Sequence, residues 1–189
     1  MGAFLLSFGV IFVAELGDKS QLMALAFATR YRPAQVLLGI TLATAVVHAG
    51  SVLAGAAFAA ALPTRAIGIA AGLAFLGFAA WTIRGDRLTE EERERARRPA
   101  RSAILAISTA FFLAELGDKT MIATVTLAAS EEPIGTWLGS TVGMVAADAL
   151  AIVVGRVLGT RLPERAVSRF AAASFVIFGV LLVVDALRG

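Results

Sequence analysis

Six long apolar stretches alternate with short polar segments along the chain. A helix needs about 20 predominantly apolar residues to cross the hydrocarbon core of a bilayer, and each stretch is close to or above that length. The pattern therefore predicts an all-α polytopic membrane protein with six transmembrane helices. The stretches cover approximately residues 2–28, 34–62, 66–83, 102–129, 134–158 and 166–187.

The second half of the chain repeats the first half at a constant offset of 100 residues. Between positions 11 and 20, seven of ten residues are identical to their counterparts. Because each half holds an odd number of predicted helices, the second half enters the membrane from the opposite side, as an inverted repeat. We expect two three-helix units, residues 1–83 and 102–189, joined by a charged linker over residues 84–101.

The positive charges of the chain are unevenly distributed between the two sides of the predicted membrane domain. Arginines gather after the first, third and fifth apolar stretches, as Arg30, Arg32, the arginines of the linker, Arg156, Arg161 and Arg165. The other side holds Arg65, Arg188, Glu131 and Glu132. Positively charged loops favour the cytoplasm, so we expect a multi-pass protein of the cell (inner) membrane with a cytoplasmic linker and both termini outward. This placement explains the net charge of +3 without a nucleic-acid partner.

The linker contains a short helix pattern. Thr89-Glu90-Glu91-Glu92 has the spacing of a capping box, and the acid–arginine pairs Glu91–Arg95 and Glu94–Arg98 are four residues apart. We interpret this segment as a solvated surface helix that ends before Pro99, with a regulatory metal or lipid site as the alternative. In the third stretch, Gly68-x-x-x-Gly72 suits close helix packing and leaves a homodimer open.

Six residues inside the first stretch, Glu15-Leu16-Gly17-Asp18-Lys19-Ser20, recur in the fourth as Glu115-Leu116-Gly117-Asp118-Lys119-Thr120. A charge at the bilayer centre costs roughly 3 kcal/mol on insertion scales, so such groups are kept mainly where they bind, move or pair with something. On a continuous helix the glutamate and aspartate of each motif share one face. The inverted repeat brings both motifs together near the midplane. Four acids and two lysines leave a formal charge of −2, which suits one divalent cation, or protons in its absence.

Neighbouring residues supply further oxygen atoms for a cation. Ser20, Gln21 and Thr120 add neutral ligands, while Gly17 and Gly117 let the backbone bend or approach an ion. The chain has no cysteine and a single histidine, which excludes thiolate sites and multi-histidine zinc sites. An all-oxygen site favours Mn²⁺, Ca²⁺ or Mg²⁺. The alternative is a pair of intrahelical ion pairs, glutamate to lysine within each motif, with no ligand and both aspartates unpaired.

Two further titratable residues occupy equivalent positions in the second and fifth stretches. His48 and Asp148 are counterparts at the offset of 100 residues. Both residues change charge with protonation, and histidine does so near neutral pH. They are candidates for a proton relay that differs between the halves, or alternatively for polar groups that join neighbouring helices.

The duplicated motif in a six-helix inverted repeat resembles the calcium/manganese–proton exchanger family, whose eukaryotic members reside in the Golgi membrane. Its compact bacterial members look like manganese exporters. The resemblance covers nearly the whole chain. It implies that Glu15, Asp18, Glu115 and Asp118 take part in cation binding and proton exchange, and that Lys19, Ser20, Lys119 and Thr120 complete the motif around the structural residues Gly17 and Gly117. A glutamine often follows the motif in this family, and Met121 departs from that pattern where Gln21 fits it.

We therefore expect a secondary-active divalent cation/proton antiporter that exports Mn²⁺ from the cytoplasm by alternating access. A Ca²⁺/H⁺ antiporter is the alternative within transport, and a passive divalent cation channel is the alternative from another class. No nucleophile–base pair stands beside the motifs, so we do not expect an enzyme. The expected partners are divalent metal ions, protons and the lipid bilayer, without a prosthetic group.

Overall fold

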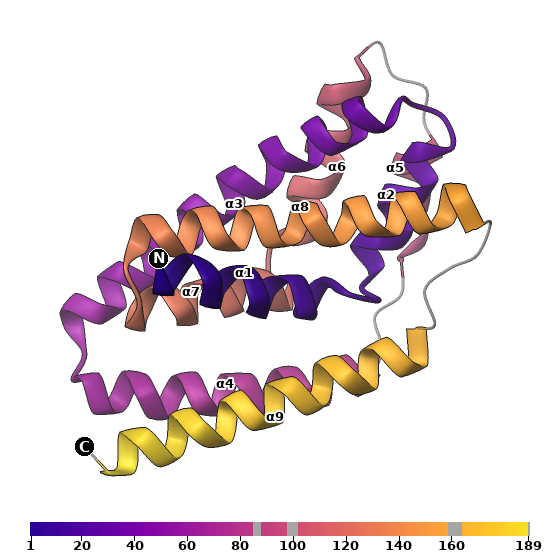
Figure 1. Ribbon diagram of the computed structural model, residues 1–189. Helices are drawn as coiled ribbons and strands as arrows, with labels where there is room; N and C mark the ends of the chain where they lie inside the picture. The colour runs from indigo at the N-terminus through magenta and orange to yellow at the C-terminus, as the bar shows by residue number, and fades with distance from the viewer. Residues whose placement is uncertain (85–87, 98–101, 159–163, 189) are drawn as a thin grey trace.

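The computed structural model describes residues 1–84, 88–97, 102–158 and 164–188, which form helices and no strand. Figure 1 shows their arrangement. The helices are α1 (Gly2–Glu15), α2 (Lys19–Ala28), α3 (Pro33–Ala61), α4 (Thr64–Arg84), α5 (Glu90–Arg97), α6 (Ala103–Glu115), α7 (Lys119–Ser130), α8 (Pro133–Leu158) and α9 (Glu164–Arg188). Four of them are long and apolar enough to cross a membrane, namely α3, α4, α8 and α9, while α1 and α6 are shorter apolar helices.

The first and fourth apolar stretches are each broken at the charged motif. α1 ends at Glu15 and α2 begins at Lys19, and the second copy is divided in the same way between α6 and α7. Gly17 and Gly117 have φ values of 77° and 81°, a left-handed conformation that only glycine adopts without strain. Each break is followed by an aspartate at the N-cap of the next helix. The prediction of one continuous helix through each motif is therefore wrong.

The most extensive helix contacts are those of α1 along α8 and of α4 along α9 (Figure 1). The half-helices α6 and α7 both pack along α3. Glycines permit the close approach, since a Cβ added at Gly143 of α8 would lie 2.6 Å from the carbonyl oxygen of Phe8 in α1. On α3, a Cβ at Gly39 would lie 2.7 Å from Ile107 of α6.

The Gly68-x-x-x-Gly72 pattern is used inside the chain. A Cβ added at Gly68 would lie 2.8 Å from Ala186 of α9, and one at Gly72 would lie 2.7 Å from the carbonyl oxygen of Gly179. Beside this contact, the rings of Phe75 and Phe175 have centroids 5.9 Å apart. The small residues thus explain α4–α9 packing, and they provide no argument for a homodimer.

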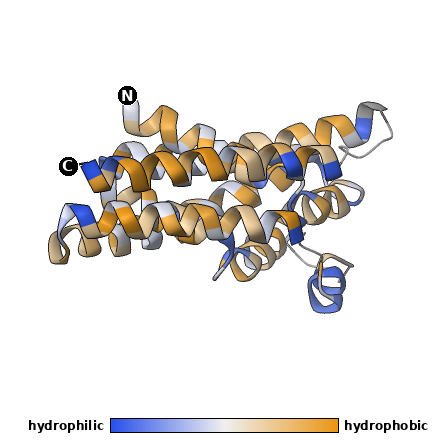
Figure 2. Ribbon diagram, turned by 90° about the horizontal axis from the view of Figure 1, so that it is seen from below, coloured by the Kyte–Doolittle hydropathy of each residue, from blue (hydrophilic) through white to orange (hydrophobic). Residues whose placement is uncertain are grey.

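The outer surface of the long helices is apolar. Large side chains such as Leu53, Ile83 and Leu105 are at least two-thirds exposed. Figure 2 shows hydrophobic residues along the long helices. Hydrophilic residues are concentrated near helix ends and on the short helix at the lower right. Lipid-exposed helices satisfy their backbone hydrogen bonds internally and present apolar side chains outward. The protein is accordingly an all-helical, multi-pass membrane protein.

The predicted linker helix is present as α5, and its capping box is confirmed. The Thr89 amide donates to Glu92 Oε2 (2.7 Å), and the Glu92 amide donates to Thr89 Oγ1 (3.2 Å). The pair Glu91–Arg95 is formed at 3.4 Å, whereas Arg98 and Pro99 lie outside the described residues. The expectation of a fully solvated helix is wrong on one face, because Ala96 is buried among apolar residues of the core.

Candidate cation site

Each motif is built around the break between two half-helices. The Ser20 hydroxyl donates to the Glu15 carboxylate, and the Thr120 hydroxyl donates to Glu115 Oε2 (2.9 Å). Asp18 caps α2 by accepting from the Ser20 amide (3.3 Å). The last residue of one half-helix is thereby tied to the first turn of the next in both copies.

Gln21 and Met121 each accept a hydrogen bond from the glycine amide in the turn of their motif. Gln21 Oε1 accepts from the Gly17 amide at 2.9 Å, and Met121 Sδ accepts from the Gly117 amide at 3.2 Å. The glutamine does more, because its Nε2 also donates to the Ala147 carbonyl of α8 at 3.0 Å. Met121, which stands where the glutamine would be in the second motif, therefore preserves the hydrogen bond in the turn. It lacks the contact with a neighbouring helix that Gln21 makes.

The four motif acids are withdrawn from the surface. Glu15, Asp18, Glu115 and Asp118 are between 0% and 3% exposed. Lys119 of the second motif donates a hydrogen bond to Asp18 of the first and forms an ion pair with it. The Glu15 carboxylate also lies within electrostatic range of Glu115 and Asp18. The structure therefore brings the two motifs together.

The alternative prediction, an ion pair between glutamate and lysine within one helix of each motif, is wrong. In both motifs the glutamate ends one helix and the lysine begins the next. Lys119 reaches Asp18 across the repeats, and Lys19 Nζ lies 3.4 Å from Glu92 Oε1 of α5. The contact between Lys19 and Glu92 could not be predicted from the sequence. The capping-box spacing accounts for the conformation of Glu92, while its proximity to Lys19 depends on how α5 docks.

The two equivalent polar residues of α3 and α8 have different surroundings. Asp148 is fully buried, neither of its carboxylate oxygens has a hydrogen-bond partner in the described structure, and it interacts electrostatically with Glu15 and Glu115. His48 is also fully buried, and neither of its ring nitrogens has a hydrogen-bond partner among the described residues. Burial is the one influence on its charge found there. Asp148 therefore belongs with the motif acids, and His48 stands apart.

The acids are near one another without forming a closed coordination shell. Within the described ranges, no three aspartate, glutamate or histidine side chains converge tightly enough to enclose a metal ion. One oxygen each of Glu15 and Glu115 and both oxygens of Asp148 lack hydrogen-bond partners there. Buried carboxylate oxygens are costly when unpaired, so this arrangement suits a cation or protons that arrive as cargo.

Comparison with known proteins places this arrangement in a family. The model of the family described as "Divalent cation/proton antiporter GDT1" matches residues 3–90 and 103–189. The chain belongs to the GDT1 family. It is therefore a divalent cation/proton antiporter and not an enzyme, and the cations and protons are its substrates.

Several GDT1 relatives align with nearly the whole chain. A protein of Vibrio cholerae named "Putative manganese exporter" is 32% identical over 95% of this chain and 90% of its own length. A GDT1-like protein of Synechocystis is 34% identical, with 95% of each chain covered. A chloroplastic GDT1-like protein of Oryza sativa is 32% identical over 94% of this chain and 59% of its own length. No solved structure matches the chain.

Proposed function

We propose that this antiporter exports Mn²⁺ from the cytoplasm in exchange for protons, by alternating access at the two motifs. The observation that carries the proposal is the ion pair between Lys119 and Asp18, which joins two broken helices from opposite halves of the chain. Broken helices that meet at the midplane are the usual binding-site architecture of inverted-repeat transporters. The name of the Vibrio cholerae relative supports manganese as the cargo.

The proposed ligands are the carboxylates of Glu15, Asp18, Glu115 and Asp118, with Asp148 as a fifth acid on α8. The oxygens of Ser20, Gln21 and Thr120 complete the oxygen-rich surroundings, and Lys19 and Lys119 offset part of the negative charge. An ionised carboxylate is expensive to bury without a partner. A divalent cation or protons must therefore occupy the same oxygens in turn, and this competition couples the two movements.

We further propose six membrane crossings arranged as two inverted repeats, residues 1–83 and 102–189, joined by the linker 84–101. In this arrangement the half-helices α1 and α2 cross together, as do α6 and α7. Equivalent contacts support an approximate two-fold relation. Thr44 donates to its own counterpart Met144 across the two halves (3.2 Å), and Phe75 meets its counterpart Phe175.

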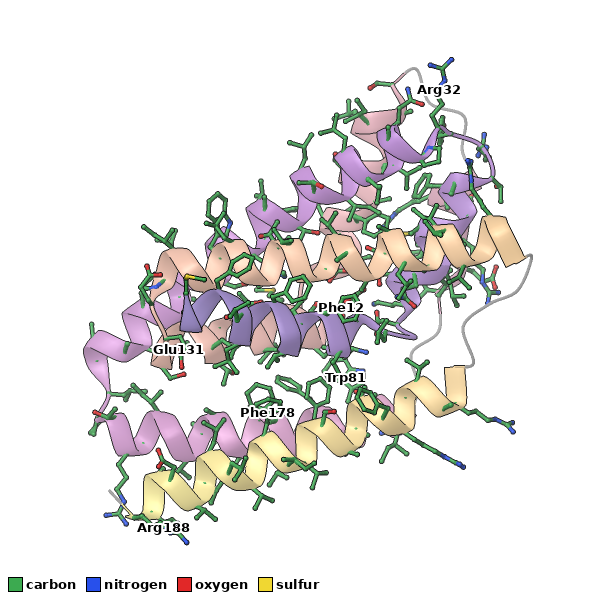
Figure 3. All side chains as sticks on the ribbon, viewed as in Figure 1. Phe12, Arg32, Trp81, Glu131, Phe178 and Arg188 are labelled. Atoms are coloured by element: carbon green, nitrogen blue, oxygen red, sulfur yellow. The ribbon has the colours of Figure 1, made fainter. Side chains whose placement is uncertain are left out.

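The proposed orientation has the linker in the cytoplasm and both termini outside the inner membrane. Arg32 lies at one end of the molecule, and Glu131 and Arg188 lie at the other (Figure 3). At the arginine end, Arg156 donates to the carbonyl of Ala28 (2.6 Å). Both termini lie at the end opposite to α5 (Figure 1). Arg161 falls outside the described residues.

Transport into proteoliposomes with an imposed pH gradient tests this function. We expect Mn²⁺ uptake to follow the gradient in the wild type and to be lost in Glu15→Gln and Asp118→Asn. Uptake that ignores the gradient in the wild type, or persists fully coupled in both variants, contradicts the mechanism and favours a passive channel. Competition between Mn²⁺ and Ca²⁺ in the same assay separates the manganese exporter from a Ca²⁺/H⁺ antiporter, since oxygen ligands suit both ions.

A further inference from the structure

The linker helix α5 is docked on both halves of the transporter. It contacts α2 of the first half and α6 of the second. Ala96 is 2% exposed within an apolar cluster that includes Met23 and Phe27 of α2. At the C-terminal end of α5, Arg30 Nη1 donates to the Ala96 carbonyl at 3.1 Å, where helix carbonyls lack partners in their own helix.

Glu92 is the acid of α5 that faces the first motif. Its Oε2 accepts the Thr89 amide and fixes the start of the helix, which leaves Oε1 3.4 Å from Lys19 Nζ. The Glu92 side chain is 10% exposed, whereas Glu90 and Glu91 are 86% and 82% exposed and pair with arginines of α5 itself. The capping box thus aims one carboxylate oxygen at the motif lysine.

This contact exists for only one of the two motif lysines. Lys119 is directed to Asp18 of the other half, while its counterpart Lys19 is held by Glu92. The described chain carries α5 once, between the repeats, so the repeat symmetry of the two half-sites is broken by the linker.

We propose that α5 is a latch, formed by Glu92 and Ala96 with their partners Lys19 and Arg30, which holds the transporter in the state seen here by retaining Lys19. This inference rests on the proposed alternating access. In an inverted-repeat transporter the two halves exchange roles between the outward- and inward-facing states. Lys19 then takes the part that Lys119 plays here, and it must leave Glu92 to do so. Glu92 is a positioning residue that acts through Lys19.

The test compares Glu92→Gln with its neighbour Glu91→Gln, which changes the same charge at a surface position. In proteoliposomes with a pH gradient, we expect the maximal rate of Mn²⁺ uptake to rise about twofold to fivefold in Glu92→Gln, the range for a partly exposed ion pair. Glu91→Gln should match the wild type. Arg30→Gln removes the hydrogen bond to the Ala96 carbonyl without changing the motif, and it should also raise the rate. A rise in this second variant keeps the test decisive if Glu92→Gln fails to fold.

A second measurement follows α5 directly. The chain has no cysteine, so a dye on Glu91→Cys reports on α5 alone. We expect its anisotropy to fall when Mn²⁺ and the gradient start turnover, and to be low already when Glu92→Gln is added. Unchanged or lower uptake rates in both latch variants, or an anisotropy that stays constant during turnover, overturn the latch. Loss of gradient dependence in the wild type would instead refute the proposed exchange.

Discussion

Asp148 and His48 occupy equivalent positions in the two repeats, but their buried surroundings differ. Both side chains are fully buried at equivalent positions, yet within the described residues an electrostatic interaction with the motif glutamates is found for Asp148 and not for His48. The sequence identified the pair but left open whether the two residues relay protons or join helices. Neither carboxylate oxygen of Asp148 has a hydrogen-bond partner in the described residues, which supports our proposal that Asp148 acts at the cation site.

Asp148→Asn removes one negative charge next to the motifs while keeping the shape of the side chain. We expect Mn²⁺ binding to purified protein to weaken by about tenfold, the lower end of the range for changes around a metal site. The matched change His48→Gln should alter affinity less than threefold. Isothermal titration calorimetry in detergent measures both. Equal losses in the two variants would contradict the separation of Asp148 from His48.

At the scale of the elements, the decisive feature is the interruption of two apolar stretches. Hydropathy reports only that a segment is apolar and long enough, so it cannot distinguish a continuous helix from two half-helices. Gly17 and Gly117 indicate in the sequence that the backbone can bend at each motif. The positive φ value of each glycine, with an aspartate at the N-cap position of the helix that follows, gives the backbone a defined turn.

Gly117→Ala tests the need for a left-handed residue at the break. No atom lies within 4 Å of a Cβ added there, so the cost comes from backbone strain and not from a clash. We expect a loss of roughly 1–2 kcal/mol in stability. A Cβ at Gly77, inside α4, also meets nothing within 4 Å and has an ordinary helical φ, so Gly77→Ala should be neutral or slightly stabilising. Thermal unfolding in detergent compares the two, and equal melting temperatures would contradict the strain argument.

At the scale of the whole molecule, α5 connects the two halves through a contact that depends on charge. Burial by itself would raise the pKa of Glu92, but hydrogen bonds from Thr89 and the charge of Lys19 outweigh burial and lower the pKa below its ordinary value of 4.5. The carboxylate form therefore stabilises docking of α5 above pH 4.5. This contribution is lost as the pH falls through the lowered pKa of Glu92.

We expect the anisotropy of a dye on Glu91→Cys to be high at neutral pH and to fall as the medium is acidified below pH 4.5. The same label in a Glu92→Gln background should show low anisotropy at every pH, because glutamine carries no charge to lose. A pH-dependent fall of equal size in both proteins would show that another group controls the docking of α5.

The sequence by itself determined the membrane character, the duplicated motif, the residues that carry charge into the apolar stretches, and the capping box of α5. These properties depend on local composition and on identity between the halves. The tertiary structure decided that each motif interrupts a helix, that Lys119 reaches Asp18, that Asp148 joins the motif acids without His48, and that Glu92 holds Lys19. Each of these depends on which distant segments come into contact, and packing alone settles that. Helical spacing within one segment contains no such information.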